Sequence, residues 1–243
     1  MKRHQRMFFT NCLASLFFLL LVQQAPAFAQ TPESPQDIAR RLQARYDQMQ
    51  SLSFEFFQDT RGETTGGRRQ GSGEAFFVKG ADHNRMRWDY SLPNKQVLLS
   101  DGIQFIMYFA ELNQMIISPA ESLEKEMTYS FFSGSAKLKD GFDILPAEAD
   151  FHTESSDNVS VIQLVPLVPH SQVQDIHLWV TDDSLLQRIT IRDHFGTLTV
   201  LNLSNIVANA LENTTPEKLE QLFSFVPPEG VEIIEQERTR IIP

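Results

Sequence analysis

Near the start of the chain, apolar side chains recur every three or four residues. Ser34 and Pro35 match a helix start, because a serine side chain caps a helix and proline fits its first turn. The apolar positions that follow are separated by arginines and other polar residues, and they are Ile38, Leu42, Tyr46 and Met49. This spacing predicts an amphipathic helix of about four turns.

From Leu52 onward, apolar residues alternate with polar ones, which is the pattern of half-buried β-strands. Turn residues such as Asp101-Gly102 separate the runs. The clearest runs are 70–78, 86–90, 103–109, 159–165, 173–180 and 185–192, with short end strands expected at 223–226 and 231–234. The pattern predicts a mainly β protein with about nine to eleven antiparallel strands in one sheet that curls into a sandwich or into an open or closed barrel.

The alternation stops between Pro119 and Asp140. Here Leu123, Met127 and Phe131 recur every four residues, opposite several charged side chains. We expect a short helix in this segment and another at 216–222. Because these helices are too few to cover a flat sheet, we expect them to fill the concave side of a curved one.

The first 29 residues have the three parts of a secretory signal peptide. Basic residues come first, an apolar run at 7–22 follows, and Ala27-Phe28-Ala29 supplies a small-x-small cleavage site. The apolar run is short for a membrane span, and no cysteine follows it to carry a lipid anchor. We therefore expect cleavage after residue 29, export to a bacterial periplasm, and a single domain at 30–243.

The charge of the remaining chain is strongly negative. The first 29 residues hold three basic and no acidic residues, so the other 214 carry 18 basic and 31 acidic side chains. This balance argues against nucleic acid and anionic membrane surfaces as partners, because both require clustered lysine and arginine.

Catalytic signatures are missing from the sequence. It has no GxSxG elbow, P-loop, GxGxxG or HExxH motif, and Asp193-His194 precedes Phe195-Gly196 in a composition typical of a hairpin turn. The one cysteine, Cys12, lies in the predicted signal peptide. We therefore expect a binding protein without enzymatic activity, metal or cofactor. A periplasmic hydrolase built on scattered His, Asp and Ser residues remains the alternative.

Large apolar side chains are abundant beyond the signal peptide, with 14 Phe, two Trp and four Tyr residues. A well-filled core would account for them. The other interpretation is a cavity that accepts alkyl chains, since Phe and Met side chains adapt to irregular apolar guests.

Several motifs occur in an order that resembles a known family. They are the segment Arg87-Trp88-Asp89-Tyr90, the strand and turn at 98–102, the run Phe223 to Val231, the strand at 52–58 that follows the first helix, and Gly71-Ser72-Gly73-Glu74 ahead of a second strand. In this order, and behind a signal peptide, they resemble the periplasmic outer-membrane lipoprotein carrier proteins, the LolA family.

The resemblance implies an incomplete β-barrel whose concave face is covered by short helices that act as a lid. It also implies that the chain takes acylated lipoproteins from an inner-membrane ABC transporter and passes them to an outer-membrane lipoprotein receptor, as a monomer and without covalent chemistry. A carrier or sensor of another lipid or glycolipid on the same fold is a further alternative. The family's lid-latching arginine has no clear match here, and Arg85 and Arg87 are the nearest candidates.

For such a carrier we predict two sets of cavity residues. On the sheet side, the acyl-chain cavity is expected to be lined by Phe54, Met86, Trp88, Tyr90, Phe105 and Met107. On the lid helix, the apolar face is expected to consist of Leu123, Met127 and Phe131.

Overall fold

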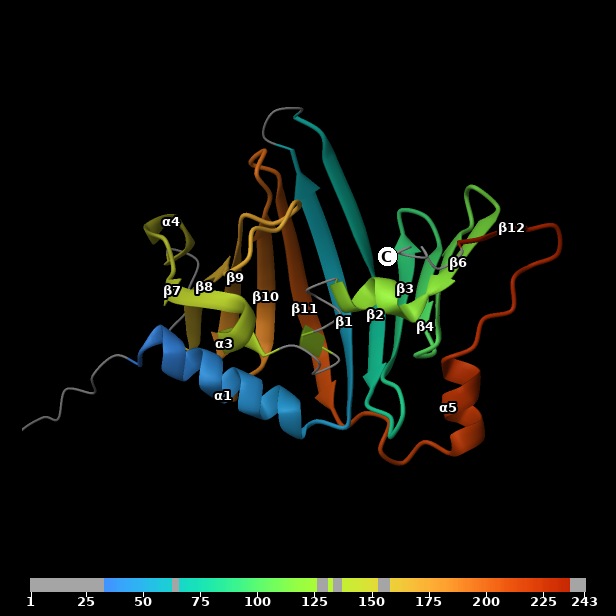
Figure 1. Ribbon diagram of the computed structural model, residues 1–243, viewed down its shortest axis with the longest axis horizontal. Helices are drawn as coiled ribbons and strands as arrows, with labels where there is room; N and C mark the ends of the chain where they lie inside the picture. The colour runs from blue at the N-terminus through green and yellow to red at the C-terminus, as the bar shows by residue number, and fades with distance from the viewer. Residues whose placement is uncertain (1–32, 63–65, 126–130, 133–136, 153–157, 237–243) are drawn as a thin grey trace, which may run out of the picture. The chain divides into compact units, whose positions relative to one another are not determined.

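The computed structural model (Figure 1) describes residues 33–62, 66–125, 131–132, 137–152 and 158–236. The chain divides into two units, Met1–Pro32 and Glu33–Pro243, and the fold described below is that of the second unit. The predicted signal peptide and cleavage site lie outside the described residues. No helix within the described ranges is long and apolar enough to cross a membrane.

One twelve-stranded sheet forms the body of the second unit. The strands are β1 (Ser51–Arg61), β2 (Arg68–Val78), β3 (Arg85–Leu92), β4 (Gln96–Ser100), β5 (Gln104–Phe109), β6 (Gln114–Pro119), β7 (Phe142–Pro146), β8 (Val159–Pro166), β9 (Asp175–Thr181), β10 (Leu186–Arg192), β11 (Leu198–Ala208) and β12 (Glu232–Glu235). Their order across the sheet is β12-β6-β5-β4-β3-β2-β1-β11-β10-β9-β8-β7. β7 and β12 are edges with one neighbour each, so the sheet is open, as predicted.

Three details differ from the sequence prediction. Phe223–Val226 is not a strand, because it runs into Pro227-Pro228, which have no N–H groups to donate to a sheet. The edge strand β7 has no predicted counterpart, since it is only five residues long and follows a helical turn directly. β12 pairs with β6 in the parallel direction, whereas the other pairings are antiparallel as expected.

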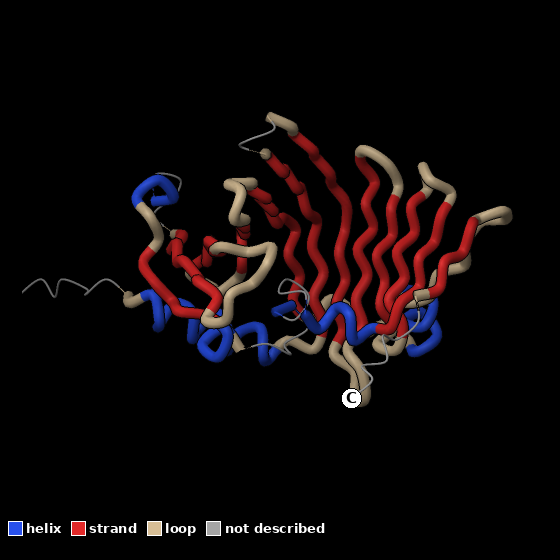
Figure 2. The backbone as a smooth tube through the Cα atoms, turned by 45° about the horizontal axis from the view of Figure 1, so that its top comes forward, coloured by secondary structure: helices blue, strands red, loops and turns tan. Residues whose placement is uncertain are grey.

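Short helices lie on one face of the sheet, as Figures 1 and 2 show. They are α1 (Pro35–Gln48), the 3₁₀ helix η1 (Ala120–Lys125) and α3 (Leu138–Gly141), while α4 (Ala149–His152) follows β7. α5 (Pro216–Leu222) precedes the irregular segment that leads to β12. The predicted cap is confirmed, because the Ser34 hydroxyl accepts the N–H of Asp37. The Thr215 hydroxyl caps α5 in the same way by accepting the N–H of Lys218.

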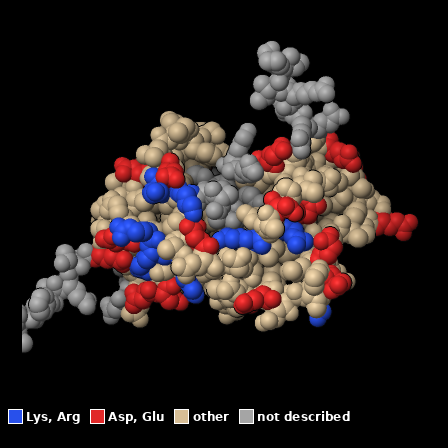
Figure 3. Space-filling view, turned by 60° about the horizontal axis from the view of Figure 1, so that its bottom comes forward, with Lys and Arg blue, Asp and Glu red and all other residues tan. Residues whose placement is uncertain are grey.

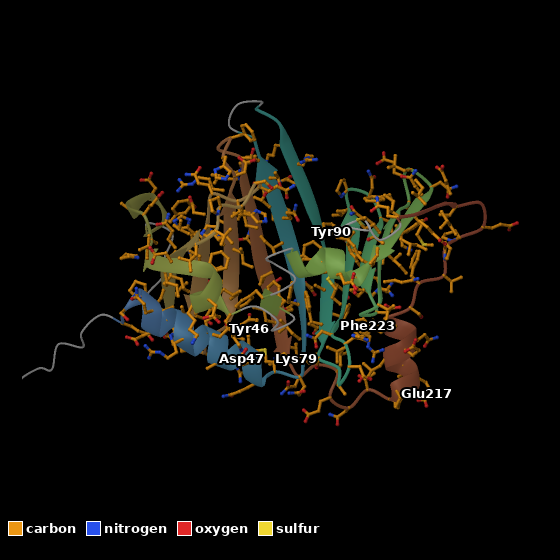
Figure 4. The ribbon with its side chains drawn as sticks, in the orientation of Figure 1. Tyr46, Asp47, Lys79, Tyr90, Glu217 and Phe223 are labelled. Atoms are coloured by element: carbon orange, nitrogen blue, oxygen red, sulfur yellow. The ribbon has the colours of Figure 1, made fainter. Side chains whose placement is uncertain are left out.

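The C-terminal end of α1 is fixed to the sheet by polar contacts (Figure 4). Lys79 Nζ donates to the carbonyl oxygens of Tyr46 and Asp47 at 2.8 and 3.0 Å. A cation at this end of a helix is favoured by the helix dipole. The Tyr46 hydroxyl also accepts the N–H of Leu186 at 3.2 Å, and burial raises the pKa of this tyrosine. These contacts hold α1 over the ends of β2 and β10.

The main core lies between α1 and the sheet face that it covers, which we call the concave face. α1 contributes its predicted apolar positions, and β1 to β3 and β8 to β11 contribute the residues that face them. A second cluster packs the opposite, convex face against the segment after α5, and its members are Val97, Leu99, Tyr108 and Met115 with Phe225 and Val231. Both faces of the sheet are therefore partly covered.

A buried carboxylate closes the far end of the β1–β2 hairpin. Asp59 accepts hydrogen bonds from Arg68 and Arg61, both at 2.7 Å, and its side chain is 5% exposed. The bond from Arg68 is the larger cause, and together the two arginines lower the pKa of Asp59 to about 2. A carboxylate with a lowered pKa stabilises the fold above its ordinary pKa of ~3.9, and this contribution is lost as the pH falls toward 2.

We expect an NMR titration of Asp59 to show its midpoint at about 2. Substituting Arg68→Ala removes the main donor and should raise this midpoint toward the ordinary value. Arg69→Ala is the matched control. Arg69 is paired with Thr60 across the hairpin, so its side chain lies on the face of the sheet opposite to that of Asp59. A wild-type midpoint near 4 would show that the two arginines do not hold this carboxylate.

Candidate functional site

An apolar cavity of about 570 Å³ lies on the concave face. Alternate residues of β3, which are Met86, Trp88 and Tyr90, form one part of its wall, and Phe105 and Met107 of β5 continue it. Side chains of alternate residues point to the same face of a strand, so this wall follows from the two-residue period of the sequence. Five of the six predicted wall residues therefore line one cavity, although their role in binding remains a prediction.

The sixth predicted residue, Phe54, does not line this cavity. Its ring contacts those of Phe77, Trp88 and Phe132 with centroids 6.1, 5.5 and 5.2 Å apart. Phe54 shares the concave face with the wall residues but sits where Phe132 fills the space. Its ring packs against the Trp88 ring in an edge-to-face arrangement.

The opposite wall comes from strands that the sequence prediction did not assign to the site. Ile189 and Ile191 of β10 face the cavity together with Thr199 and Leu201 of β11. Their alternation with Thr190 and Arg192 indicates a strand with one apolar face. It does not indicate which strand lies across the cavity, because this depends on how the whole sheet curls.

Of the three predicted lid residues, two are described and Met127 lies outside the described residues. Leu123 of η1 is 4% exposed and lines the cavity. Phe131 lines a neighbouring cavity of about 40 Å³ together with Phe132. Both cavities are also lined by Ile189 and Ile191, so they lie side by side over β10.

Phe132 was missed by the sequence prediction, although it directly follows Phe131. It is 4% exposed and packs into a cluster of aromatic rings, at centroid distances of 5.2 Å to Phe77, 6.0 Å to Tyr46 and 6.5 Å to Trp88. The prediction used apolar residues that recur every four positions, and Phe132 does not fit this repeat because it comes one position after Phe131. The Phe-Phe doublet was the available signal.

The polar groups of the cavity are few and uncharged. The Tyr90 hydroxyl donates to Gln58 Oε1 at 3.0 Å, and burial raises the pKa of Tyr90 to about 12. This phenol therefore stays neutral at physiological pH. Ser118, Thr199 and Gln236 supply the other polar side chains of the wall. A neutral, mostly apolar wall suits an uncharged apolar ligand.

Neither candidate for the lid latch contacts the lid residues that the structure describes. Arg87 donates to Asp89 and to the carbonyl oxygens of Leu222 and Ser224. Arg85 pairs with Glu220, and its guanidinium lies 5.4 Å from the centre of the Phe223 ring. Figure 4 shows Phe223 beside α5. Both arginines fasten α5 and the chain after it to the sheet.

Asp193 and His194 lie in a turn, as their composition predicted. Asp193 Oδ1 accepts the N–H groups of Phe195 and Thr197, both at 2.8 Å, and His194 contacts the carbonyl oxygen of His170. Within the described ranges, no group of three or more His, Cys, Asp or Glu side chains is placed to hold a metal ion.

An open sheet with an apolar, ligand-sized cavity on its concave face is typical of proteins that bind apolar ligands. The chain belongs to the family described as outer membrane lipoprotein carrier protein LolA, whose model matches residues 47–216. The resemblance inferred from the sequence motifs is thus confirmed.

Curated relatives agree over most of the chain. The outer-membrane lipoprotein carrier protein of Methylococcus capsulatus is 27% identical over 207 residues, which cover 85% of this chain and 90% of that protein. The protein of the same name from Alkalilimnicola ehrlichii is 28% identical over 223 residues, covering 90% and 92%. That from Nitrosomonas europaea is 25% identical over 166 residues, covering 68% and 73%. The chain is therefore similar to carrier proteins along 73% to 92% of their length.

Proposed function

We propose that this protein is a periplasmic carrier that shelters the acyl chains of lipoproteins in the apolar cavity and moves lipoproteins from the inner to the outer membrane. An inner-membrane lipoprotein-releasing ABC transporter would load it, and an outer-membrane lipoprotein receptor would unload it. The signal peptide predicted at 1–29 would deliver it to the periplasm. Membership of the carrier family supports the role, and the 570 Å³ apolar cavity is the observation that carries it.

The physical need for a carrier is large. Exposing one acyl chain of ~16 carbons to water costs about 12 kcal/mol, at ~0.8 kcal/mol per CH₂. A cavity of ~150 Å³ holds benzene, so 570 Å³ provides room for one such chain and part of another. A cargo with three chains then requires a larger space than the empty protein offers.

The cover of the cavity supplies a way to enlarge it. Leu123, Phe131 and Phe132 are the large apolar residues that the structure describes between β6 and α3, and they line the cavity and its 40 Å³ neighbour. Displacing Phe131 and Phe132 would join the two cavities above Ile189 and Ile191. The binding step then consists of an exchange of aromatic side chains for acyl chains, with no bond made or broken.

The surface charge of the face in Figure 3 is relevant to how the protein would contact the transporter and the receptor. Lys and Arg side chains are interspersed with Asp and Glu side chains on it, without one large area of a single sign. A surface on which both signs are mixed in this way favours solubility of the protein and reversible contacts with its partners. This is consistent with a carrier that must leave both the transporter and the receptor.

A charge placed on the cavity wall tests the proposal. Met107→Glu puts a carboxylate beside the acyl chain, and the cost of desolvating it should weaken the binding of a triacylated lipopeptide at least about 100-fold. The half-buried Met107 faces the open cavity, so the variant should still fold. Binding is measured by titration calorimetry and photo-crosslinking, and folding by thermal unfolding.

Phe57→Glu is the matched control, because Phe57 lies on the convex face of β1 and is 43% exposed. It should bind the lipopeptide like the wild type. Equal binding by Met107→Glu and Phe57→Glu would show that acyl chains do not enter this cavity.

A further inference from the structure

A second hollow, of about 800 Å³, opens next to the apolar cavity. It lies between the end of the β1–β2 hairpin, the β3–β4 turn and the β5–β6 turn, and we call it the rim groove. Its wall includes Thr60, Arg69, Gln70, Asn94, Lys95 and Leu112. Gln58 and Tyr90 line both the rim groove and the apolar cavity, so the two spaces meet at these side chains.

The boundary between the two spaces is a short ladder of hydrogen-bonding groups. Tyr90 donates to Gln58 at 3.0 Å, and Gln58 Nε2 donates to the Thr60 hydroxyl at 3.4 Å. The Tyr90 ring rests on Gly71, where an added Cβ would lie 3.2 Å from the ring. Tyr90, which is labelled in Figure 4, lies on the side of β3 that faces the cavity, because it is one of the residues that line it. A ligand that extends past Tyr90 and Gln58 therefore leaves apolar surroundings and enters polar ones.

The rim groove also contains an open strand edge. β2 begins at Arg68, but its pairing with β3 begins only at Ser72. Residues 68–71 therefore pair with β1 on one side and face the groove on the other. An unpaired strand edge is a site where an extended peptide adds by main-chain hydrogen bonds.

The charge of the rim groove is opposite to that of the chain. Its described lining carries three cations, Arg68, Arg69 and Lys95, against one carboxylate, Glu111, and Arg68 is paired with Asp59. Arg69 and Lys95 are exposed and, among the described residues, have no ion-pair partner. Two available cations at one groove stand out in a chain with a net charge of −10.

We propose that the rim groove binds the extended peptide segment that follows the acylated residue of a lipoprotein, and that it favours segments with acidic side chains. This inference rests on the proposed function, because the acyl chains would occupy the adjoining cavity. The acylated residue would cross the Tyr90–Gln58 boundary, and its peptide would run along residues 68–71 within reach of Arg69 and Lys95. The open strand edge favours a peptide over a lipid headgroup, which has no main chain to pair.

The test compares three synthetic ligands with the full chain. One is a diacylglyceryl-cysteine amide without a peptide, and the others carry four acidic or four basic residues after the same cysteine. We expect the wild type to bind the acidic lipopeptide about tenfold more tightly than the basic one, a preference that shrinks in high salt. Arg69→Glu combined with Lys95→Glu should reverse the preference and leave the affinity for the cysteine amide unchanged.

Arg40→Glu combined with Arg45→Glu is the control, because it makes the same change of charge on the exposed face of α1. It should keep the wild-type preference. Hydrogen exchange should slow at residues 68–71 on binding the acidic lipopeptide but not the cysteine amide.

Three results would overturn the inference. Equal affinities for all three ligands would leave the acyl cavity intact and remove the peptide site. Tighter binding of the acidic lipopeptide without slower exchange at residues 68–71 would mean that the groove attracts negative charge, as on a lipid headgroup, without pairing to a peptide main chain. If the wild-type protein did not bind the cysteine amide either, both the proposed function and this inference would be wrong.

Discussion

Phe132→Ala is expected to destabilise the empty protein and to tighten its binding of acyl chains. Removing a ring that is 4% exposed and packed against those of Phe54, Phe77, Trp88 and Tyr46 should lower the free energy of unfolding by about 3–5 kcal/mol. If Phe132 must leave this cluster before acyl chains enter, the same loss makes opening easier. The apparent dissociation constant then falls, by about tenfold or more.

Phe54→Ala separates this effect from ordinary core damage. Phe54 is 3% exposed and belongs to the same ring cluster, but it lies on strand β1, so we expect it to stay in place when the cavity fills. It should lose similar stability without a gain in affinity. Urea unfolding and lipopeptide titration of both variants make the comparison. Weaker binding by both would show that Phe132 is a fixed part of the core and does not cover the cavity.

The features of the site that depend on residues close together in the sequence could be predicted from it. The alternation of Met86, Trp88 and Tyr90 with Arg87 and Asp89 is local, and it placed these side chains on the cavity face correctly. The cap at Ser34 is local too, and α1 begins where it predicts.

Other parts of the site depend on how distant segments meet. Ile189 and Ile191 lie across from β3 only because β1 and β11 join the two halves of the sheet. Phe54 obeys the same two-residue period as the wall residues, yet Phe132 covers it. No local pattern separates a strand residue that faces a cavity from one that faces a packed ring.

A buried ion cluster behind β9 and β10 fixes the strand that carries Ile189 and Ile191. The Arg192 guanidinium donates to Asp175 at 2.8 Å and to Glu148 at 2.7 Å, and it thereby joins β9, β10 and the chain before α4. The Asp175 side chain is 3% exposed. Burial tends to raise its pKa, but the His177 ring nitrogen 3.3 Å from its Oδ1 and the hydrogen bond from Arg192 outweigh burial and lower it. Asp175 is therefore a buried anion that depends on its partners.

Arg192→Met is expected to lower the free energy of unfolding by about 3–5 kcal/mol at pH 7, because it leaves this buried carboxylate without its cation. The lowered pKa of Asp175 means that the stabilisation is present above its ordinary pKa of ~3.9 and is lost as the pH falls through its lowered value, so the cost of Arg192→Met should shrink only below about pH 4. Adding Asp175→Asn should recover much of the loss at pH 7.

Arg40→Met is the surface control, since Arg40 is 74% exposed in its pair with Asp37 and should cost less than about 0.5 kcal/mol. Urea unfolding at several pH values measures all of these variants. A cost for Arg192→Met no larger than that of the control would mean that the cluster does not hold β10. If the cost is large, lipopeptide binding should weaken with it, because Ile189 and Ile191 lie on the same strand as Arg192 and form the wall opposite β3.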